Sequence, residues 1–410
     1  MHRVHDRSKI ILACAWVLAF GAYCPMLGLP PIVHIAKQAL HVGNEAMGIL
    51  FSIPVAMLIA VAIPGGWLGD RIGARKAVAI AALVLAAGSL MRGLAESFTV
   101  LMAFTVLYGI GYSMLLPNLP KLMSIWFPRE KVGVATGCYA TGITVGSTAA
   151  LALTLPVVFP LFHTIQGTFF FWGLPAAIAA ILWLVLSTDP PASAYGSGDT
   201  RGTKGNLSQH PTLWKNKNLW ILALLLFFND VHFYVWSAWT PSLLTMKGAS
   251  PDLASFIASS RCWASLPAMF LMPWASHKVG LRKPFMWGSA LLLMVATWIT
   301  LYMPFQWGWA LMAVVGIATS GTFAMLLALP IEMLPRTAVG TATGAILSVG
   351  YIGGLLGPWL TGRLVDMTGS FDYAVIGLAV VAGLWMIAGF LMPEAGEKAT
   401  KTLRAVRQEA

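Results

Sequence analysis

Charged residues are scarce in this chain of 410 residues, where Asp, Glu, Lys and Arg together make up only 10%. Soluble globular proteins carry about 25% of these residues, so the composition excludes an ordinary soluble domain. Hydrophobic residues make up 58% of the chain. They gather in runs of about 20, the length of a helix that crosses a hydrocarbon core about 30 Å thick. Runs of this length also exclude a barrel of short alternating strands. The sequence therefore predicts an all-α integral membrane protein.

Cysteine is also sparse, with only four in the chain. None has the spacing of a metal site or a partner in a loop, so neither a zinc site nor a disulfide framework is expected. All four lie in predicted helices, where we interpret them as packing residues: Cys14, Cys24, Cys138 and Cys262. The sequence also lacks a phosphate-binding loop and a paired nucleophile and base. We therefore expect no metal, no cofactor and no enzymatic activity.

The apolar runs predict twelve transmembrane helices in succession, with no large soluble domain between them. The longest connection, residues 188–216, is rich in Gly, Ser, Pro and Thr and has the composition of a flexible linker. The predicted spans are 9–33, 46–67, 77–95, 98–125, 132–158, 165–187, 217–244, 252–275, 284–303, 307–332, 337–364 and 371–393.

The net charge of +11 could indicate a nucleic-acid partner, but the distribution of the basic residues argues against it. With the N-terminus inside, most Lys and Arg fall in inner segments, and the outer segments hold only Lys37, Arg92, Lys247 and Arg363. This bias places both termini on the cytoplasmic side of the inner membrane. We therefore expect a lipid bilayer and no nucleic acid as partner. The first apolar run has no clear cleavage site, so we interpret it as an uncleaved span.

One stretch of the chain occurs twice. Residues 65–76 read GGWLGDRIGARK, and residues 277–283, which begin 207 positions after Asp70, read HKVGLRK. At the same offset, VGVATG at 132–137 matches VGTATG at 339–344. Two matches at one offset, in a chain about twice that long, indicate a duplicated half, as in many transporters. We predict six-helix halves at 1–187 and 217–393, a linker at 188–216 and an inner tail at 394–410.

The first copy predicts a very short reversal at the inner membrane surface. Gly73 lets the backbone turn tightly, and Asp70 can cap a helix end or pair with a basic residue across the half. Arg75 and Lys76 are placed to contact lipid headgroups. A generic basic inner loop is the alternative interpretation, and the repetition of the segment argues against it.

The pattern of this loop resembles the segment between helices 2 and 3 of the major facilitator superfamily (MFS). The matching residues are Gly66, Asp70, Arg71, Gly73, Arg75 and Lys76. The resemblance covers the whole chain, because twelve spans, two halves, an inside N-terminus and a long middle loop all agree with it. It implies the MFS fold of twelve helices in two six-helix halves, and secondary transport by alternating access around a central site. The second copy departs from the pattern, with His277 in place of Asp70, as second copies in this family often do.

A second segment indicates a branch of that family. Residues 119–128, LPKLMSIWFP, with GVATG at 133–137, resemble a segment common in anion-type branches, which include monocarboxylate, oxalate/formate and cyanate porters. A similar segment occurs in haem and choline carriers, so it narrows the substrate class without deciding it. The fifth span lacks the G-P pair typical of drug/proton antiporters, which counts against a drug exporter.

Two charges are predicted to lie deep in the hydrocarbon, Arg261 and Asp230, whereas Lys121 and Glu332 lie near helix ends and can snorkel to the surface. An intramembrane charge must be paired, hydrated or functional. The residues on the same helix face as Arg261 are small and leave room for a ligand: Ala258, Ser265 and Ala268. A guanidinium offers a planar fork to a carboxylate. The alternative is that Arg261 pairs permanently with Asp230 in a purely structural role.

The family resemblance supports the ligand interpretation, because monocarboxylate and oxalate/formate porters also use an arginine on helix 8. The monocarboxylate pattern with Asp four residues earlier is absent, since position 257 is Ile. The repeat maps Arg261 onto Pro54, so the second arginine of nitrate/nitrite porters is missing, and no Lys or Arg lies deep in helix 11. One buried positive charge best balances one negative charge, which favours a monoanion.

The seventh predicted helix holds the candidates for proton coupling. Asp230 or His232 could exchange a proton as substrate comes and goes. His232 shares one helix face with Asn229, Trp236 and Trp239, and Asp230 lies on the adjacent face. The alternative for His232 is an aromatic packing residue.

The remaining candidate substrate contacts are hydroxyl, amide and indole groups on helices that line MFS cavities. They are Tyr23, Tyr108, Tyr112, Asn118, Tyr139, Asn229, Trp263 and Tyr351. Each of them could equally be a packing residue.

The set predicts a monomeric, proton-coupled carrier for a small monocarboxylate or similar organic anion. The alternative function is an exporter of larger apolar or cationic compounds, which Arg261 disfavours because it would repel a cation. A membrane receptor without transport activity is a third possibility, disfavoured by the intact first motif.

Overall fold

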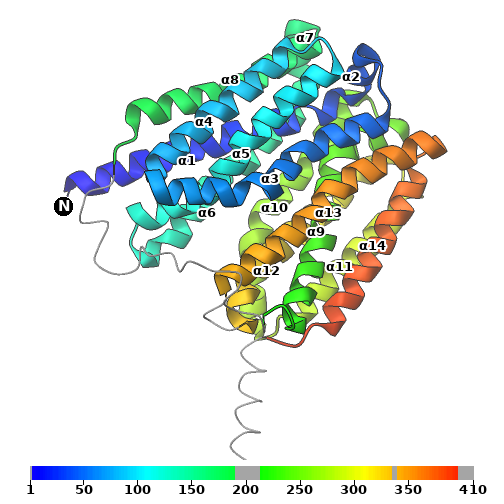
Figure 1. Ribbon diagram of the computed structural model, residues 1–410. Helices are drawn as coiled ribbons and strands as arrows, with labels where there is room; N and C mark the ends of the chain where they lie inside the picture. The colour runs from blue at the N-terminus through cyan, green and yellow to red at the C-terminus, as the bar shows by residue number, and fades with distance from the viewer. Residues whose placement is uncertain (1, 190–212, 335–338, 396–410) are drawn as a thin grey trace, which may run out of the picture. The chain divides into compact units, whose positions relative to one another are not determined.

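The computed structural model describes residues 2–189, 213–334 and 339–395, and in these ranges all the regular secondary structure is helical, with no strands (Figure 1). Ten helices in the described ranges are long and apolar enough to cross a membrane. Two further long helices, α10 and α11, complete the twelve predicted positions. α10 is less apolar because it carries Arg261 and several serines. The prediction of an all-α membrane fold is confirmed. Most of the predicted linker (188–216) and tail (394–410) lies outside the described residues.

Six long helices come from the first part of the chain. They are α1 (His2–Leu27), α3 (Asn44–Ile72), α4 (Ala74–Met91), α5 (Phe98–Trp126), α6 (Arg129–Leu153) and α8 (Ile165–Leu186). Short elements join them: η1 (Pro30–Ile32), α2 (Val33–Leu40), η2 (Arg92–Leu94), η3 (Thr154–Val158) and α7 (Phe159–Phe162). The second part supplies α9 (Lys217–Met246), α10 (Pro251–Val279), α11 (Lys283–Thr300), η6 (Phe305–Trp307), α12 (Gly308–Met333), α13 (Val339–Thr368) and α14 (Asp372–Leu391).

The contacts between residues group the chain into two compact units. The first unit is Met1–Arg201 with Ala238–Ser259, and the second is Gly202–Ser237 with Ser260–Ala410. α9 and α10 therefore each contribute residues to both units. The predicted boundaries of the two six-helix halves stay a prediction.

Two predicted spans differ from the observed helices, and proline explains both differences. The span predicted at 9–33 ends earlier, at Leu27, and is followed by η1 and α2. Pro30 and Pro31 have no backbone N–H to donate, so α1 cannot continue through them. The span predicted at 132–158 ends as an α-helix at Leu153 and continues as the π-helical η3. A π-helical turn around Pro156 accommodates the missing donor.

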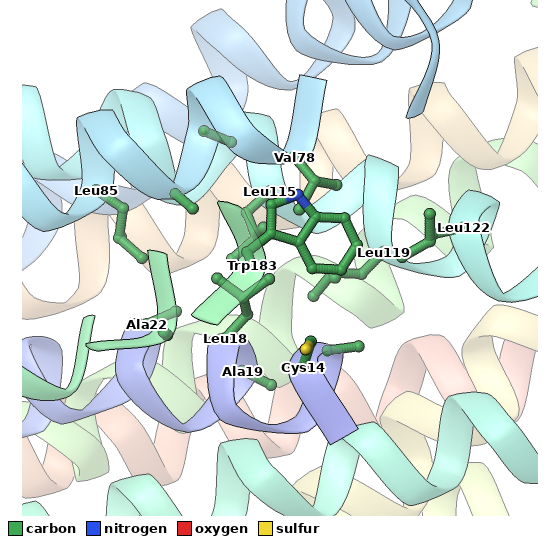
Figure 2. Close-up of a cluster of buried hydrophobic side chains, with 14 of the residues drawn as sticks. Cys14, Leu18, Ala19, Ala22, Val78, Leu85, Leu115, Leu119, Leu122 and Trp183 are labelled. Atoms are coloured by element: carbon green, nitrogen blue, oxygen red, sulfur yellow. The ribbon is translucent and has the colours of Figure 1, made fainter. Parts of the chain in front are cut away.

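The core of the first unit forms around Trp183 of α8, which is fully buried. Figure 2 shows its indole ring among aliphatic side chains of α1, α4 and α5, which include Leu18, Val78 and Leu115. Burial of this apolar surface against neighbouring helices, together with close packing, fixes the frame on which the polar residues of the unit stand.

Glycines let helices of each unit meet backbone to backbone, and they do so at repeat-related positions. A Cβ on Gly146 would crowd the carbonyl of Phe20, and 207 positions later a Cβ on Gly353 would crowd the carbonyl of Phe227. A Cβ on Gly109 would likewise crowd the backbone of Pro54, and at the same offset a Cβ on Gly316 would crowd the backbone of Arg261. The offset found in the inner-loop motif therefore also relates packing contacts deep inside the helices.

Candidate functional site

In the inner-loop motif, a single residue reverses the chain direction between two long helices. α3 ends at Ile72, α4 begins at Ala74, and Gly73 between them has φ of +90°. This backbone region is open almost only to glycine, because a Cβ is strained there. A Cβ at Gly73 would meet no other atom within 4 Å, so the conformation alone requires glycine.

Replacing Gly73 by Ala should therefore destabilise the protein by about 1–3 kcal/mol through backbone strain. Gly133 is the matched control, because a Cβ there also meets nothing within 4 Å but the residue lies in α6 without a positive φ. Thermal unfolding of the two variants measures the difference. Equal melting temperatures for Gly73→Ala and Gly133→Ala would contradict the assignment of strain to this turn.

Ion pairs hold the loop to its own unit. Asp70, which is exposed, accepts a hydrogen bond from Lys121 of α5, one of the two arrangements expected for it. Lys121 was expected to snorkel to the surface, and its partly exposed side chain forms an interhelical ion pair with the exposed Asp70. Arg75 was expected to contact lipid headgroups, but its guanidinium lies 3.0 Å from the Asp189 carboxylate and 3.1 Å from the Ser187 hydroxyl. The reason is that α8 ends within reach of the loop, as the bond from Trp183 Nε1 to the Arg75 carbonyl indicates.

The other motif residues are two surface cations and a partly buried glycine of α3. Arg71 stacks over Trp67 at 5.0 Å, and Lys76 is exposed. Gly66 is partly buried, with the ring of Pro117 at 3.8 Å from the position of a Cβ.

The second copy of the motif is also tied by an ion pair, through Arg282, which corresponds to Arg75 at the offset of 207. Arg282 is 2.7 Å from Glu332 of α12, so the loop here provides the base and the neighbouring helix the acid. The backbone N–H of Arg282 donates to Glu394 at 2.6 Å, three residues after α14 ends at Leu391. Asp189 likewise lies three residues beyond the end of α8. His277 stands where the first copy has Asp70. The second copy needs no acid at this position, because its ion pair is formed by Arg282 and Glu332.

Arg261 is buried in the second unit, with 3% of its surface exposed. Its guanidinium lies over the ring of Phe233 at 4.7 Å, and its Nη2 is 3.9 Å from the sulfur of Cys262. The carbonyl of Arg261 accepts a hydrogen bond from Ser265 at 2.8 Å and lies against Gly316 of α12. α10 and α12 thus fix the backbone of Arg261, while aromatic and sulfur contacts hold its side chain.

Asp230 is buried to the same degree, with 3% exposed. Within the described part of the chain no Lys, Arg or His nitrogen comes within 4.0 Å of its carboxylate, and its Oδ2 has no hydrogen-bond partner. The permanent pairing with Arg261 that was the alternative interpretation is therefore not present in this structure. A buried carboxylate of this kind must either take up a proton or meet a cation.

His232 lies on a different side of α9. Its ring is 6.1 Å from that of Trp385 of α14, and it is fully buried next to the backbone of Leu378. Asn229 donates its amide to the carbonyl of Thr319 at 2.8 Å, which ties α9 to α12. Tyr351 is partly exposed on α13.

Three predicted tyrosines gather in the first unit. Tyr112 donates to the hydroxyl of Tyr23 at 2.8 Å, and Tyr108 stacks on Tyr112 at 6.0 Å. Tyr108 donates in turn to the carbonyl of Ala22 at 2.6 Å. Tyr139 is buried on α6 with 6% exposed. The tyrosine cluster, meaning Tyr23, Tyr108 and Tyr112, is therefore one connected group.

Two predicted contacts lie elsewhere. Asn118 donates to the carbonyls of Gly65 and Met114, at 3.0 and 2.8 Å, and its side chain leaves no room for a Cβ on Gly69. It therefore joins α3 to α5 beneath the loop motif. Trp263 is 63% exposed and stands two positions from Arg261, hence on the opposite face of α10. The structure does not bring it together with Arg261.

One buried charge was missed by the sequence analysis. Arg92 was expected in an outer segment, yet only 3% of it is exposed. Its Nη1 donates to the carbonyl of Pro25 at 2.7 Å, and its guanidinium lies 4.6 Å from the ring of Phe169. Arg92 lies near the outer end of the span predicted at 77–95, and it was assigned to the outer segment for that reason.

Within each unit, helices of membrane length pack around buried charges, and ion pairs tie the repeated loop to its own unit. The family model of the Major Facilitator Superfamily matches residues 11–249 and 235–409. The chain therefore belongs to this superfamily, whose members are transporters and not enzymes.

The similar proteins include carriers named for small anions. The cyanate transport protein CynX of Escherichia coli is 25% identical over 87% of this chain and 90% of its own. The probable sulfoacetate transporter SauU of Cupriavidus necator is 22% identical over 97% and 98% of the two chains. Among solved structures, the D-xylose-proton symporter matches with a TM-score of 0.76 at 15% identity, over 94% of this chain and 96% of its own. The resemblance to the anion-type branch is confirmed, and the solved structure supports the fold.

Proposed function

We propose that this protein is a proton-coupled carrier that moves a small organic monoanion, most simply a monocarboxylate, by alternating access. Arg261 holds the carboxylate. The observation that carries the proposal is a buried guanidinium with no acidic partner in the described ranges. A buried cation of this kind is stabilised when an anion arrives, and a guanidinium binds a carboxylate through two parallel hydrogen bonds.

The surroundings of Arg261 favour one negative charge over two. Phe233 covers one face of the guanidinium, so its N–H edge is the part available to a ligand. The repeat-related position is Pro54, which offers no second cation. The relatives named for cyanate and sulfoacetate support an anionic substrate. An exporter of cationic compounds is disfavoured, because Arg261 would repel them at short range.

Asp230 is the proposed proton carrier. It is buried without a cationic partner in the described chain, on the same helix as Phe233, whose ring contacts Arg261. His232 contacts Trp385 of α14 instead, so we assign it a packing role. In this proposal the proton on Asp230 and the anion on Arg261 cross together, so that the net charge moved is small. The chain works as a monomer in the inner membrane, with both termini on the cytoplasmic side.

Asp230→Asn should abolish proton-driven accumulation, because an amide of the same shape cannot exchange a proton. Uptake of labelled lactate and benzoate into proteoliposomes with an acidic exterior measures it. The variant should take substrate only to its equilibrium level but still exchange internal for external substrate. His232→Gln is the matched control and should accumulate like wild type. If accumulation survives in Asp230→Asn and fails in His232→Gln, the proton carrier is His232 and not Asp230.

A further inference from the structure

Two pairs of a tryptophan and a cation stand at corresponding positions of the repeat. The guanidinium of Arg71 lies 5.0 Å from the ring centre of Trp67, near the end of α3. The ammonium of Lys278 lies 5.1 Å from the ring centre of Trp274, near the end of α10. Both pairs are related by the offset of 207. Both cations are surface residues, and the indoles of Trp67 and Trp274 are 57% and 58% exposed. The proposed transport mechanism assigns no role to either indole.

The length of α10 places the second pair in the interfacial layer of a bilayer. α10 has 29 residues, so it is about 44 Å long at about 1.5 Å per residue. A bilayer with its headgroups is about 40–45 Å thick. Trp274 is therefore about 8 Å along the helix from Val279, where α10 ends. This depth is the boundary between headgroups and hydrocarbon, where tryptophan is enriched in membrane proteins.

The same face of α10 is apolar one turn deeper. Phe270 lies four residues before Trp274, on the same side of the helix, and is 59% exposed. Lys278 lies four residues after Trp274, on the same side again. The face thus presents an apolar ring at hydrocarbon depth, then an interfacial indole, and then a cation. A phospholipid has the matching order of acyl chain, glycerol ester and phosphate.

Lys278 has N–H donors for an anion. Among the described residues, no carboxylate oxygen lies within 4.0 Å of its ammonium nitrogen. Two acids that contact the following loop are engaged by other groups: Glu332 pairs with the Arg282 side chain, and Glu394 accepts from backbone N–H groups of Arg282 and Lys283. The indole covers one side of the ammonium by a cation–π contact. An ammonium has three N–H donors, so donors remain for a phosphate.

The two copies differ in the charge beside the cation. Asp70 precedes Arg71 in α3, and its exposed side chain pairs with Lys121. The corresponding residue in α10 is His277, so no carboxylate adjoins Lys278 in the sequence. A carboxylate next to the cation would repel a phosphate. The end of α10 is therefore a better site for a negative headgroup than the end of α3.

We propose that the end of α10 at Val279 binds a phospholipid with a net negative headgroup. Lys278 binds the phosphate, Trp274 packs against the glycerol ester region, and Phe270 contacts an acyl chain. The occupant is a lipid and not a free anion, because the face continues from the cation to apolar side chains at hydrocarbon depth. This site is separate from the proposed substrate site at Arg261, and its test needs no transported anion.

Native mass spectrometry of the purified chain counts the lipids that it retains from mixed micelles. The probes are phosphatidylglycerol, which is anionic, and phosphatidylcholine, which has no net charge, with the same acyl chains. Wild type should retain phosphatidylglycerol in preference to phosphatidylcholine. Lys278→Gln should reduce that preference about fivefold, the effect of one cation at an anionic membrane surface. Lys278→Arg should keep it. An unchanged preference in Lys278→Gln overturns the proposal.

The first copy supplies the matched control. Arg71→Gln removes the corresponding cation and should leave the preference for phosphatidylglycerol unchanged. His277→Asp restores the acid of the first copy next to Lys278 and should lower the preference as much as Lys278→Gln does. Equal losses in Arg71→Gln and Lys278→Gln, or no loss in His277→Asp, would contradict a selective site on α10.

Two further measurements distinguish a lipid from a free anion. An excess of inorganic phosphate should not displace phosphatidylglycerol, and displacement would show a site for a free anion and overturn the proposal. Trp274→Ala should lower the retention of both lipids, since the indole contacts a region that they share, and unchanged retention would remove the indole from the site. The substituted residues are exposed, so every variant should melt close to the wild-type temperature, which thermal unfolding in the same micelles checks.

Discussion

Gly316→Ala should lose transport and destabilise the protein by about 3 kcal/mol, at the upper end of the effects seen for overpacked sites. A Cβ at this position would overlap the carbonyl oxygen of Arg261, and backbone atoms cannot rotate away as a flexible side chain can. α12 would have to move from α10 at the level of the buried guanidinium. The bond between Ser320 and Ser265, at 2.9 Å, joins the same two helices and would break with the shift.

Gly377→Ala and Gly288→Ala are the matched controls for this variant. Both glycines lie in helices of the second unit, and a Cβ on either would meet nothing within 4 Å. Alanine is favoured over glycine in a helix by about 0.5–1 kcal/mol, so these variants should melt at or above the wild-type temperature. Thermal unfolding and uptake of labelled benzoate measure the contrast. A Gly316→Ala protein that folds and transports like the controls would contradict the close contact.

Arg261→Ala should reduce anion uptake by about 100-fold or more. The loss of charge-assisted hydrogen bonds to a desolvated carboxylate accounts for about 3 kcal/mol, and each 1.4 kcal/mol corresponds to about tenfold. The fold should survive, because the small neighbours of Arg261 do not depend on its side chain for hydrogen bonds: Ser265 bonds to the backbone carbonyl.

Arg261→Lys separates charge from geometry in the same assay. Lysine keeps a positive charge but lacks the planar fork, so we expect uptake between that of wild type and Arg261→Ala. Cys262→Ala removes the sulfur that lies 3.9 Å from Arg261 Nη2 and should have little effect. If Arg261→Ala takes up the anion as fast as wild type at an equal amount of folded protein, Arg261 does not bind the anion.

The sequence was sufficient for the features that depend on local chemistry or on the repeat. The twelve apolar runs each contain a long helix, Gly73 turns the chain between α3 and α4, and Arg261 and Asp230 are both buried. The reason is that hydrophobic length, glycine backbone freedom and the cost of a charge in hydrocarbon act on each segment separately.

The features that were missed depend on how helices meet. Nothing near Lys121 in the sequence specifies Asp70 as its partner, since the pair joins α3 to α5. Arg92 lies near the outer end of a predicted span, and its burial depends on contacts with the end of α1 and with Phe169 of α8. The position of Trp263 was within reach of sequence reasoning, because residues two positions apart on a helix point to nearly opposite faces.

The thermal stability of purified protein across a panel of solutes tests the central claim most directly. A ligand that binds only the folded state raises the melting temperature, by an amount that grows with its concentration over the dissociation constant. Benzoate, lactate and cyanate should stabilise wild type and leave Arg261→Ala unchanged, while tetraphenylphosphonium and glucose should affect neither. Anion-induced shifts that persist in Arg261→Ala, or shifts caused only by the cation, would contradict a monoanion site at Arg261.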